Sequence, residues 1–180
     1  MHDVEKAKMI FIKYGGSHFH MERNGEFDYY KSFNILKQQE VAWIKEYQRE
    51  IVEKLQASTD VSLYNTMLPE LFRTITQFKI VDHLSVLNKF IFKDVQQLDS
   101  FTQLRVAEGF IGLLESIGNN NDNTILEIRQ HTKVMLENIS NQSMSVDSYY
   151  KKIDYLKDVL TDDKIRSRVK SSLNKLSENH

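Results

Sequence analysis

The sequence predicts a mainly α-helical protein, with about seven antiparallel amphipathic helices in a helical-repeat-like stack or bundle and a small N-terminal β-hairpin. Apolar residues recur at helical spacing from about residue 35 onward, and a single proline in 180 residues forces few breaks. The stretch 13–33, KYGGSHFHMERNGEFDYYKSF, holds three of the six glycines and an Asn-Gly pair between aromatic-rich segments, which is typical of a hairpin. We expect a single domain, 1–180, in which 1–33 form the hairpin appendage and 34–180 the helical region.

Composition narrows the class of protein. Lys and Arg number 24 and Asp and Glu 25, so the net charge is −1, whereas proteins that bind nucleic acid phosphates non-specifically carry a clear positive surplus. The absence of cysteine excludes disulfides, thiolate zinc sites and cysteine nucleophiles. The apolar run at 9–12 is too short for a signal peptide core, and no window is long enough to span a membrane. We expect a soluble cytoplasmic protein without a cofactor.

Seven segments place their apolar residues on one helical face each. The segments and their inward residues are 35–56 (Val41, Ile44, Tyr47, Ile51, Leu55), 67–79 (Leu68, Leu71, Ile75, Phe78), 82–93 (Leu84, Leu87, Ile91), 101–117 (Leu104, Ala107, Ile111, Leu114), 125–139 (Ile125, Ile128, Met135, Ile139), 146–160 (Tyr149, Ile153, Leu156) and 163–177 (Ile165, Val169, Leu173, Leu176).

Several residues predict where these helices begin and end. Pro69 is expected in the first turn of its helix, where a missing N–H costs little. Ser100 with Gln103, and Thr124 with Glu127, match the capping-box pattern at a helix start. Gly118 is expected to end the helix that starts at Ser100, because glycine readily adopts the left-handed conformation at that position.

The last pair of helices resembles a known repeat unit. The segment LKDVLTDDKIRSRVKSSLNKL, 156–176, has a leucine ending a first helix, an acidic turn, an Ile-Arg step, and small and leucine positions after it. The residues at those places are Leu160, Asp162, Ile165, Arg166, Val169, Ser172, Leu173 and Leu176. This pattern is similar to a HEAT or armadillo-type α-helical repeat, and QLRVAEGFIGLL, 103–114, resembles it more faintly. The resemblance implies stacked helix pairs with a broad binding surface.

A three-residue loop at 23–25 gives the hairpin the register that one buried face specifies. A two-residue Asn-Gly turn would mix polar and apolar side chains on both faces. Gly25 takes the left-handed position in the preferred loop. One face is then wholly apolar and consists of Phe19, Met21, Phe27 and Tyr29. The other face is polar and consists of His18, His20, Glu22, Glu26, Asp28 and Tyr30.

The polar face of the hairpin is the candidate site in the sequence. His18, His20 and Asp28 are residue types that hold a divalent metal, and paired acids can act as acid and base around a water. Strand alternation also explains these residues as a solvated face without chemistry, and we favour that interpretation. No catalytic, cofactor-binding or partner-binding residue is assigned.

Lys164, Arg166, Arg168 and Lys170 cluster near the C-terminus. A solvated helical surface explains them, and an acidic partner or an RNA backbone is the alternative. Tyrosines 149, 150 and 155 are either half-buried packing or part of an interface.

Three classes of function therefore remain. The favoured one is a non-catalytic protein-binding or scaffold module, including an antidote or immunity-type partner protein, whose protein partner is not identified. The alternatives are a metal-dependent hydrolase centred on His18, His20 and Asp28 and a nucleic-acid binder that uses the basic C-terminal helices.

Overall fold

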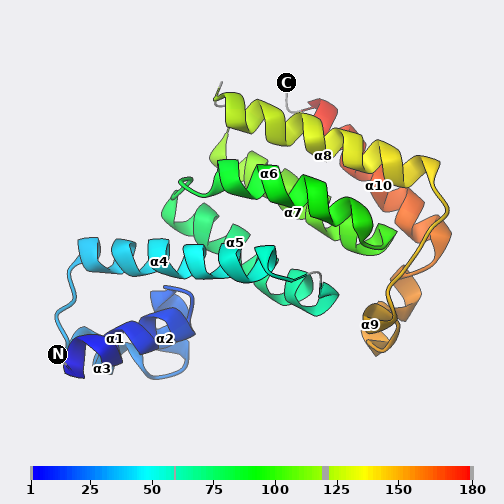
Figure 1. The fold of residues 1–180 in the computed structure, drawn as a ribbon. Helices are drawn as coiled ribbons and strands as arrows, with labels where there is room; N and C mark the ends of the chain where they lie inside the picture. Colours follow the sequence, from blue (N-terminus) through cyan, green and yellow to red (C-terminus); the bar gives the residue numbers. More distant parts are fainter. Residues whose placement is uncertain (1, 59, 119–121, 179–180) are drawn as a thin grey trace.

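Helices joined by short turns build the part of the chain that the structure describes, residues 2–58, 60–118 and 122–178 of a computed structural model (Figure 1). In chain order the elements are α1 (His2–Lys13), α2 (His18–Arg23), α3 (Phe27–Lys31), α4 (Lys37–Gln56), α5 (Val61–Phe78), α6 (Leu84–Asp94), the 3-10 helix η1 (Val95–Gln97), α7 (Ser100–Ile117), α8 (Asn123–Asn141), α9 (Ser148–Lys151), the 3-10 helix η2 (Asp154–Val159) and α10 (Asp162–Glu178). The described residues contain no strand. The prediction of a mainly α-helical chain is confirmed, and the predicted β-hairpin and the number of seven helices are wrong.

Helix α7 is central to the main core. Helices α5, α8 and α10 all pack against it, and α6 packs against α8 (Figure 1). Because α7 is apolar on most of its circumference, it is buried on several sides at once. Its buried apolar residues are Phe101, Leu104, Val106, Ala107, Phe110, Ile111, Leu113 and Leu114.

The helical spacing identified the core. Nearly all the predicted inward residues are buried or pack against the core as partly buried side chains. The fully buried ones include Ile44, Leu71, Leu87, Leu104 and Ile165. The side chain of Ile91 lies outside the described residues. None of the described helices is long and apolar enough to cross a membrane.

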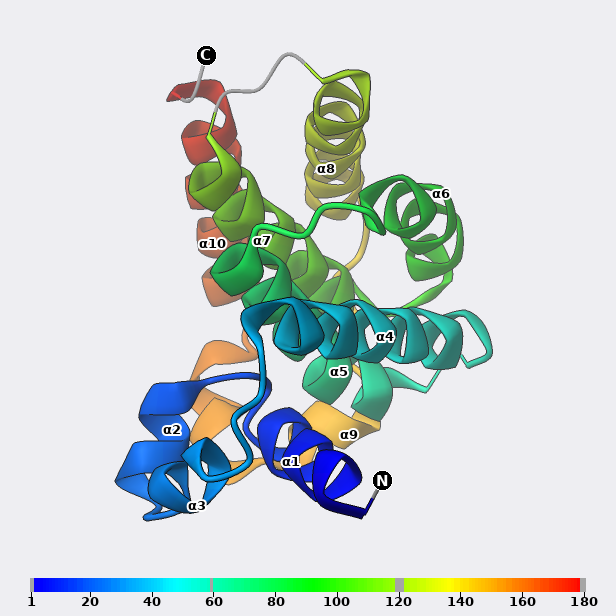
Figure 2. The same cartoon turned by 90° about the vertical axis from the view of Figure 1, so that its left-hand side faces the viewer.

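The N-terminal helices form a second, smaller core with α4. Figures 1 and 2 show α1, α2 and α3 on the side of α4 that faces away from α7 and α8. This second core consists of Ala7, Phe11, Met21, Tyr30, Trp43, Ile44 and Ile80. Residues 2–33 therefore pack as a helical group on α4.

The Asn24-Gly25 pair ends helix α2 instead of turning a hairpin. The N–H of Glu26 donates to the carbonyl of Met21, and the N–H of Gly25 donates to the carbonyl of Glu22. These two bonds are those of a Schellman motif, which requires a left-handed residue after the helix, and Gly25 has φ +73°. Both structures need a left-handed glycine at this place, so the dipeptide alone did not distinguish them.

The predicted faces of the hairpin are consequently wrong. Met21 is fully buried as expected, but Phe19 is 68% exposed and Tyr29 is 54% exposed. Tyr30, which belongs to the predicted polar face, is buried. The helical repeat of 3.6 residues brings Tyr30, and not Tyr29, onto the side that packs against Phe11, where the two rings are stacked with centroids 5.7 Å apart.

Aspartates, and not the predicted hydroxyl residues, cap α7 and α8. The side chain of Asp99 accepts hydrogen bonds from the N–H groups of Phe101 and Thr102, and Asp122 accepts one from Thr124. Each cap lies one or two residues before the predicted one, and an aspartate is an equally good N-cap. Gly118 ends α7 with φ +81°, as predicted.

Helix α5 begins earlier than predicted, because Asp60 caps it by accepting a hydrogen bond from the N–H of Ser62. Pro69 therefore lies inside the helix and not in its first turn. Proline has no N–H to donate to the carbonyl four residues before it, so this position weakens α5.

The predicted helix 146–160 is divided. Asp147 caps the short α9, and Ile153, which has extended backbone angles (φ −96°, ψ 104°), separates it from the 3-10 helix η2. Leu156 remains buried. The apolar spacing was correct here, but an extended residue interrupts the helix.

Candidate functional site

His18 binds a buried carboxylate and does not belong to an open metal site. Its Nε2 lies 2.7 Å from Oε1 of Glu40, a side chain only 4% exposed. The hydroxyl of Tyr30 donates to the same oxygen at 2.8 Å, and Lys37 donates to Oε2 at 3.2 Å. Burial and the hydrogen bond to Glu40 raise the pKa of Tyr30. Donors from α2, α3 and the start of α4 therefore satisfy one buried carboxylate, which fastens the N-terminal helices to α4.

His20 and Asp28 lie elsewhere. His20 packs edge-on against Phe19, with centroids 5.5 Å apart. The Asp28 side chain is 96% exposed and pairs with Lys31 at 2.9 Å. The structure therefore does not bring His18, His20 and Asp28 together on one face. Nowhere in the described ranges do three or more histidine, aspartate or glutamate side chains gather as a metal site would require.

The acids of the predicted polar face are separated as well. Glu26 pairs with Lys13 of α1 at 2.9 Å, and this pairing lowers the pKa of the Glu26 carboxyl. Glu22 is exposed on α2. The hydrolase hypothesis depended on a hairpin face that is absent from the described fold.

The basic C-terminal residues are partly used within the fold. Arg166 donates to the carbonyls of Ser140 and Gln142 at the end of α8. Arg168 forms a bidentate pair with Glu108 of α7. Lys164 and Lys170 are exposed. The predicted basic cluster is thus divided between helix capping, a salt bridge and solvent.

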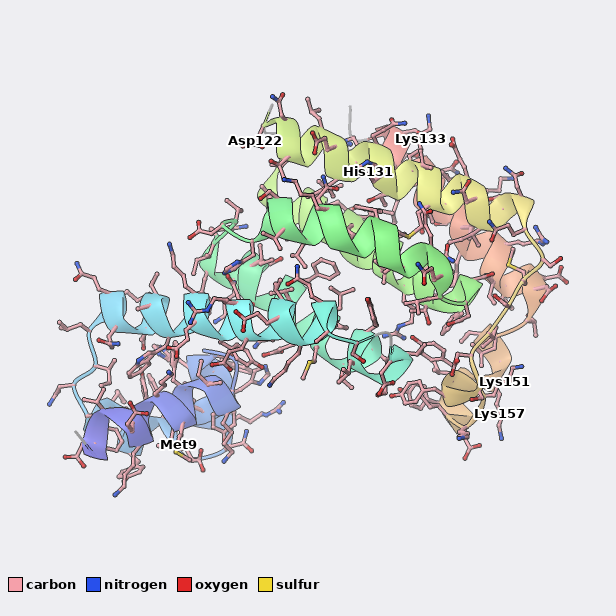
Figure 3. All side chains as sticks on the ribbon, viewed as in Figure 1. Met9, Asp122, His131, Lys133, Lys151 and Lys157 are labelled. Atoms are coloured by element: carbon pink, nitrogen blue, oxygen red, sulfur yellow. The ribbon has the colours of Figure 1, made fainter. Side chains whose placement is uncertain are left out.

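A polar link that the sequence analysis did not predict joins α6 to α8. Nδ1 of His131, which Figure 3 labels on α8, lies 2.8 Å from Oδ1 of Asn88, and Nδ2 of Asn88 donates to Glu127 at 2.9 Å. The His131 ring also packs on Phe92, with centroids 4.9 Å apart. Asn88 is buried, and both ends of its amide are bonded, so the three residues form a structural link between two helices.

A groove runs along α7, and we call it the α7 groove. It contains two hollows that share Glu108 and Arg168 as lining residues. The larger hollow has a volume of about 380 Å³ and is lined by Tyr64, Leu68, Pro69, Phe72, Thr102, Arg105, Val106, Glu108, Gly109, Tyr150 and Arg168. The smaller has a volume of about 220 Å³ and is lined by Glu108, Ile111, Gly112, Glu115, Arg168, Ser171, Ser172 and Lys175. Residues of α7 and α10 line both hollows, and residues of α5 and α9 line the larger one.

The salt bridge between Glu108 and Arg168 separates the two hollows. Nε of Arg168 donates to Oε1 of Glu108 at 3.0 Å, and one terminal nitrogen donates to Oε2 at 2.5 Å. The Arg168 guanidinium also lies over the ring of Phe101, 5.2 Å from its centroid. A bidentate pair held by an aromatic ring is a fixed feature of the surface, unlike a flexible surface ion pair.

A buried hydroxyl network holds one end of the larger hollow. The Thr102 hydroxyl donates to Asp99 and lies 3.3 Å from the hydroxyl oxygen of Tyr150. Tyr150 is buried, which raises its pKa, and its ring packs edge-on against Phe101 with centroids 4.8 Å apart. This network joins α9 to the start of α7 at one end of the hollow.

Two residues that weaken helices line the groove. Pro69, the one proline of the chain, lies inside α5, and Gly112 lies in the middle of α7. A methyl group built at Gly112 would meet no atom within 4 Å, so the described structure gives no packing reason for glycine there. At Gly109 the reason is clear, because an added Cβ would lie 2.4 Å from Cε2 of Phe72. Violations of local rules without a structural reason are expected at functional sites.

Arg105 is the other distinctive residue of the larger hollow. It is half-buried, and no described carboxylate forms an ion pair with it, whereas Arg168 is paired with Glu108. Its positive charge acts on the Tyr150 hydroxyl and opposes the rise of that group's pKa. The larger hollow therefore presents an apolar interior beside a cation without an acidic partner.

The groove residues were not predicted from the sequence. Two signals were visible: a proline within an apolar helical pattern, and glycines at 109 and 112 within the most apolar helix. We interpreted the proline as part of a first turn. Comparisons with protein-family models, with curated proteins and with solved structures find no match for this chain.

Proposed function

We propose that this chain is a non-catalytic protein-binding module that docks a polypeptide segment of a partner protein in the α7 groove. One observation carries the proposal: Pro69 and Gly112, which both weaken their helices, line one groove, where Pro69 is exposed and a Cβ added at Gly112 would meet no atom within 4 Å. Glycine in a helix interior costs about 1 kcal/mol relative to alanine, and proline costs about 3 kcal/mol. Glycine also permits close approach of a partner backbone, which gives its presence at Gly112 a reason.

The chemistry of the groove favours recognition over catalysis. Leu68, Phe72 and Val106 supply an apolar interior, and the charged and hydroxyl groups around it mostly bond one another. A hollow of about 380 Å³ lies within the range of ordinary binding sites. The groove has the apolar centre and polar rim that are typical of protein interfaces.

The resemblance of 156–176 to a HEAT-type repeat fits the same proposal. Ile165, Val169 and Leu176 of α10 are buried in the core that α7 and α8 share with it. Helices stacked side by side present extended grooves, and repeat proteins of this type bind other proteins along them.

Position-specific photo-cross-linking in the native cell tests the proposal. A benzophenone amino acid at position 171, which is exposed and lines the smaller hollow, should yield a discrete cross-linked protein. The same group at position 130, exposed on α8, is the matched control and should not yield it.

A second change links the cross-link to the groove. Gly112→Leu fills the smaller hollow without a clash at Cβ and should abolish the adduct at position 171, whereas Gln130→Leu should leave it. Equal adducts at positions 171 and 130, or an adduct that Gly112→Leu does not affect, would contradict the proposal.

A further inference from the structure

We infer that the segment bound in the α7 groove carries a carboxylate that pairs with Arg105 and, next to it, a bulky apolar side chain that fills the larger hollow. The inference rests on the proposed function and specifies the chemistry of its ligand. Two arginines, Arg105 and Arg168, line the larger hollow, but only one carboxylate, that of Glu108, does so. Both oxygens of that carboxylate already accept hydrogen bonds from Arg168.

The charge of Arg105 is exposed to an occupant of the hollow. Arg105 projects from α7 one turn from Thr102 and Gly109, on the face that lines the groove. An arginine at the edge of an apolar pocket offers planar, bidentate donors that match a carboxylate. Partial burial strengthens such a pair relative to one in bulk water.

The apolar interior determines the second element of the ligand. Leu68, Phe72 and Val106, all buried, surround the space beside Arg105. Phe72 is fixed by an edge-on contact with Phe110, whose ring centroid is 4.9 Å away, so the wall is rigid. A rigid apolar hollow binds an aliphatic or aromatic side chain by removing both surfaces from water.

A polypeptide fits these features better than a nucleic acid does. Glu108 and Glu115 alternate with Arg168 and Lys175 along the smaller hollow, so the groove offers no continuous row of cations for a run of phosphates. The net charge of −1 gives no general attraction for nucleic acid. A peptide with a single acidic residue beside an apolar one needs only one cation for pairing, and Arg105 supplies it.

The probe is a peptide selected for binding to the immobilised full chain. It comes from a phage-displayed library of random 12-residue peptides. Enriched peptides should contain Asp or Glu within a few residues of Phe, Tyr, Trp, Leu or Met. In titrations by fluorescence anisotropy, Arg105→Gln should weaken an enriched peptide by about tenfold or more, as should replacement of the peptide's acid by its amide.

Two controls make the effect specific. Arg49→Gln removes the same charge from the exposed surface of α4 and should leave the affinity within about twofold. If the acid and Arg105 contact each other, combining both changes should cost little more than either alone. Thermal melting of Arg105→Gln establishes that the variant is folded.

The outcomes separate this inference from the proposed function. Peptides that Gly112→Leu blocks, but that lack an acid and do not respond to Arg105→Gln, overturn the inference and leave the proposed function in place. If no peptide binds in a manner that Gly112→Leu blocks, both fail. A labelled 12-nucleotide RNA that binds tightly and is blocked by Gly112→Leu would overturn the assignment of a polypeptide.

Discussion

Alanine at Gly112 should raise the stability of the fold, whereas alanine at Gly109 should not, although the two residues lie on the same helix. Both substitutions gain about 1 kcal/mol of intrinsic helix preference. At Gly112 no atom lies within 4 Å of the added Cβ, so that gain is retained and the free energy of unfolding should rise by about 0.5–1 kcal/mol.

At Gly109 the added Cβ would lie 2.4 Å and 2.6 Å from two ring carbons of Phe72, whereas carbon atoms pack best at about 3.5–4.0 Å. The ring must therefore move by about 1 Å, against its edge-on contact with Phe110. Such overpacking costs about 1–3 kcal/mol, which equals or exceeds the helix gain. The free energy of unfolding of Gly109→Ala should be unchanged or lower by up to about 2 kcal/mol.

Chemical denaturation followed by circular dichroism measures both values against the wild type. In a chain of this length each 1 kcal/mol corresponds to about 2–4 °C in melting temperature, so the two variants should melt several degrees apart. If Gly109→Ala were stabilised as much as Gly112→Ala, Phe72 would not rest on position 109, and the packing of α5 on α7 that shapes the larger hollow would be wrong.

Three further predictions concern other elements. Pro69→Ala restores a backbone N–H donor inside α5 and should raise the free energy of unfolding by up to about 3 kcal/mol. The same variant should bind an enriched peptide more weakly in the groove. A lower free energy of unfolding would show that the proline ring is required for packing. Gly25→Val should destabilise the chain more than Asn24→Ala in thermal melts, because Gly25 has φ +73° and Asn24 has φ −97°, and equal losses would contradict the Schellman ending of α2. Burial and the hydrogen bond to Glu40 raise the pKa of Tyr30 above its ordinary 10.0, so this group stabilises the fold fully below pH 10.0, and its contribution falls as the pH rises further. Tyr30→Phe should therefore lower the free energy of unfolding at neutral pH by about 1–3 kcal/mol and reduce the loss of stability at alkaline pH. A loss at alkaline pH equal to that of the wild type, measured by chemical denaturation at a series of pH values, would refute this.

The sequence by itself determined the helical class and most of the core, because the helical repeat of apolar residues is a property of each segment alone. Leu71, Leu104, Ile128 and Ile165 were assigned inward from spacing, and all are buried. The ends of α7 and α8 were predicted to within one or two residues, since a cap needs only a short side chain near the first turn.

The fold of residues 2–33 was decided by tertiary packing. Asn-Gly and alternating polar residues fit a strand pair, but the same residues at helical spacing place Met21 and Tyr30 against Phe11 and α4. Burial of those side chains in the second core outweighs local strand preference, which is weak and depends on context. Tyr29 and Tyr30 show the difference between the predicted strand and the observed helix. The strand register buries Tyr29 and exposes Tyr30, whereas the helix buries Tyr30 and exposes Tyr29.

Only the tertiary structure revealed the candidate sites. Glu40 forms hydrogen bonds with His18 and Tyr30, which lie on two other helices. The α7 groove is lined by residues of α5, α7, α9 and α10. Contacts between residues so far apart in the chain leave no fixed spacing in one sequence, so neither these hydrogen bonds nor the groove could be predicted. In the sequence Pro69 and Gly112 are separate helix-weakening residues, and the packing of α5 against α7 is what brings Pro69 onto one surface with Gly112 and Arg105.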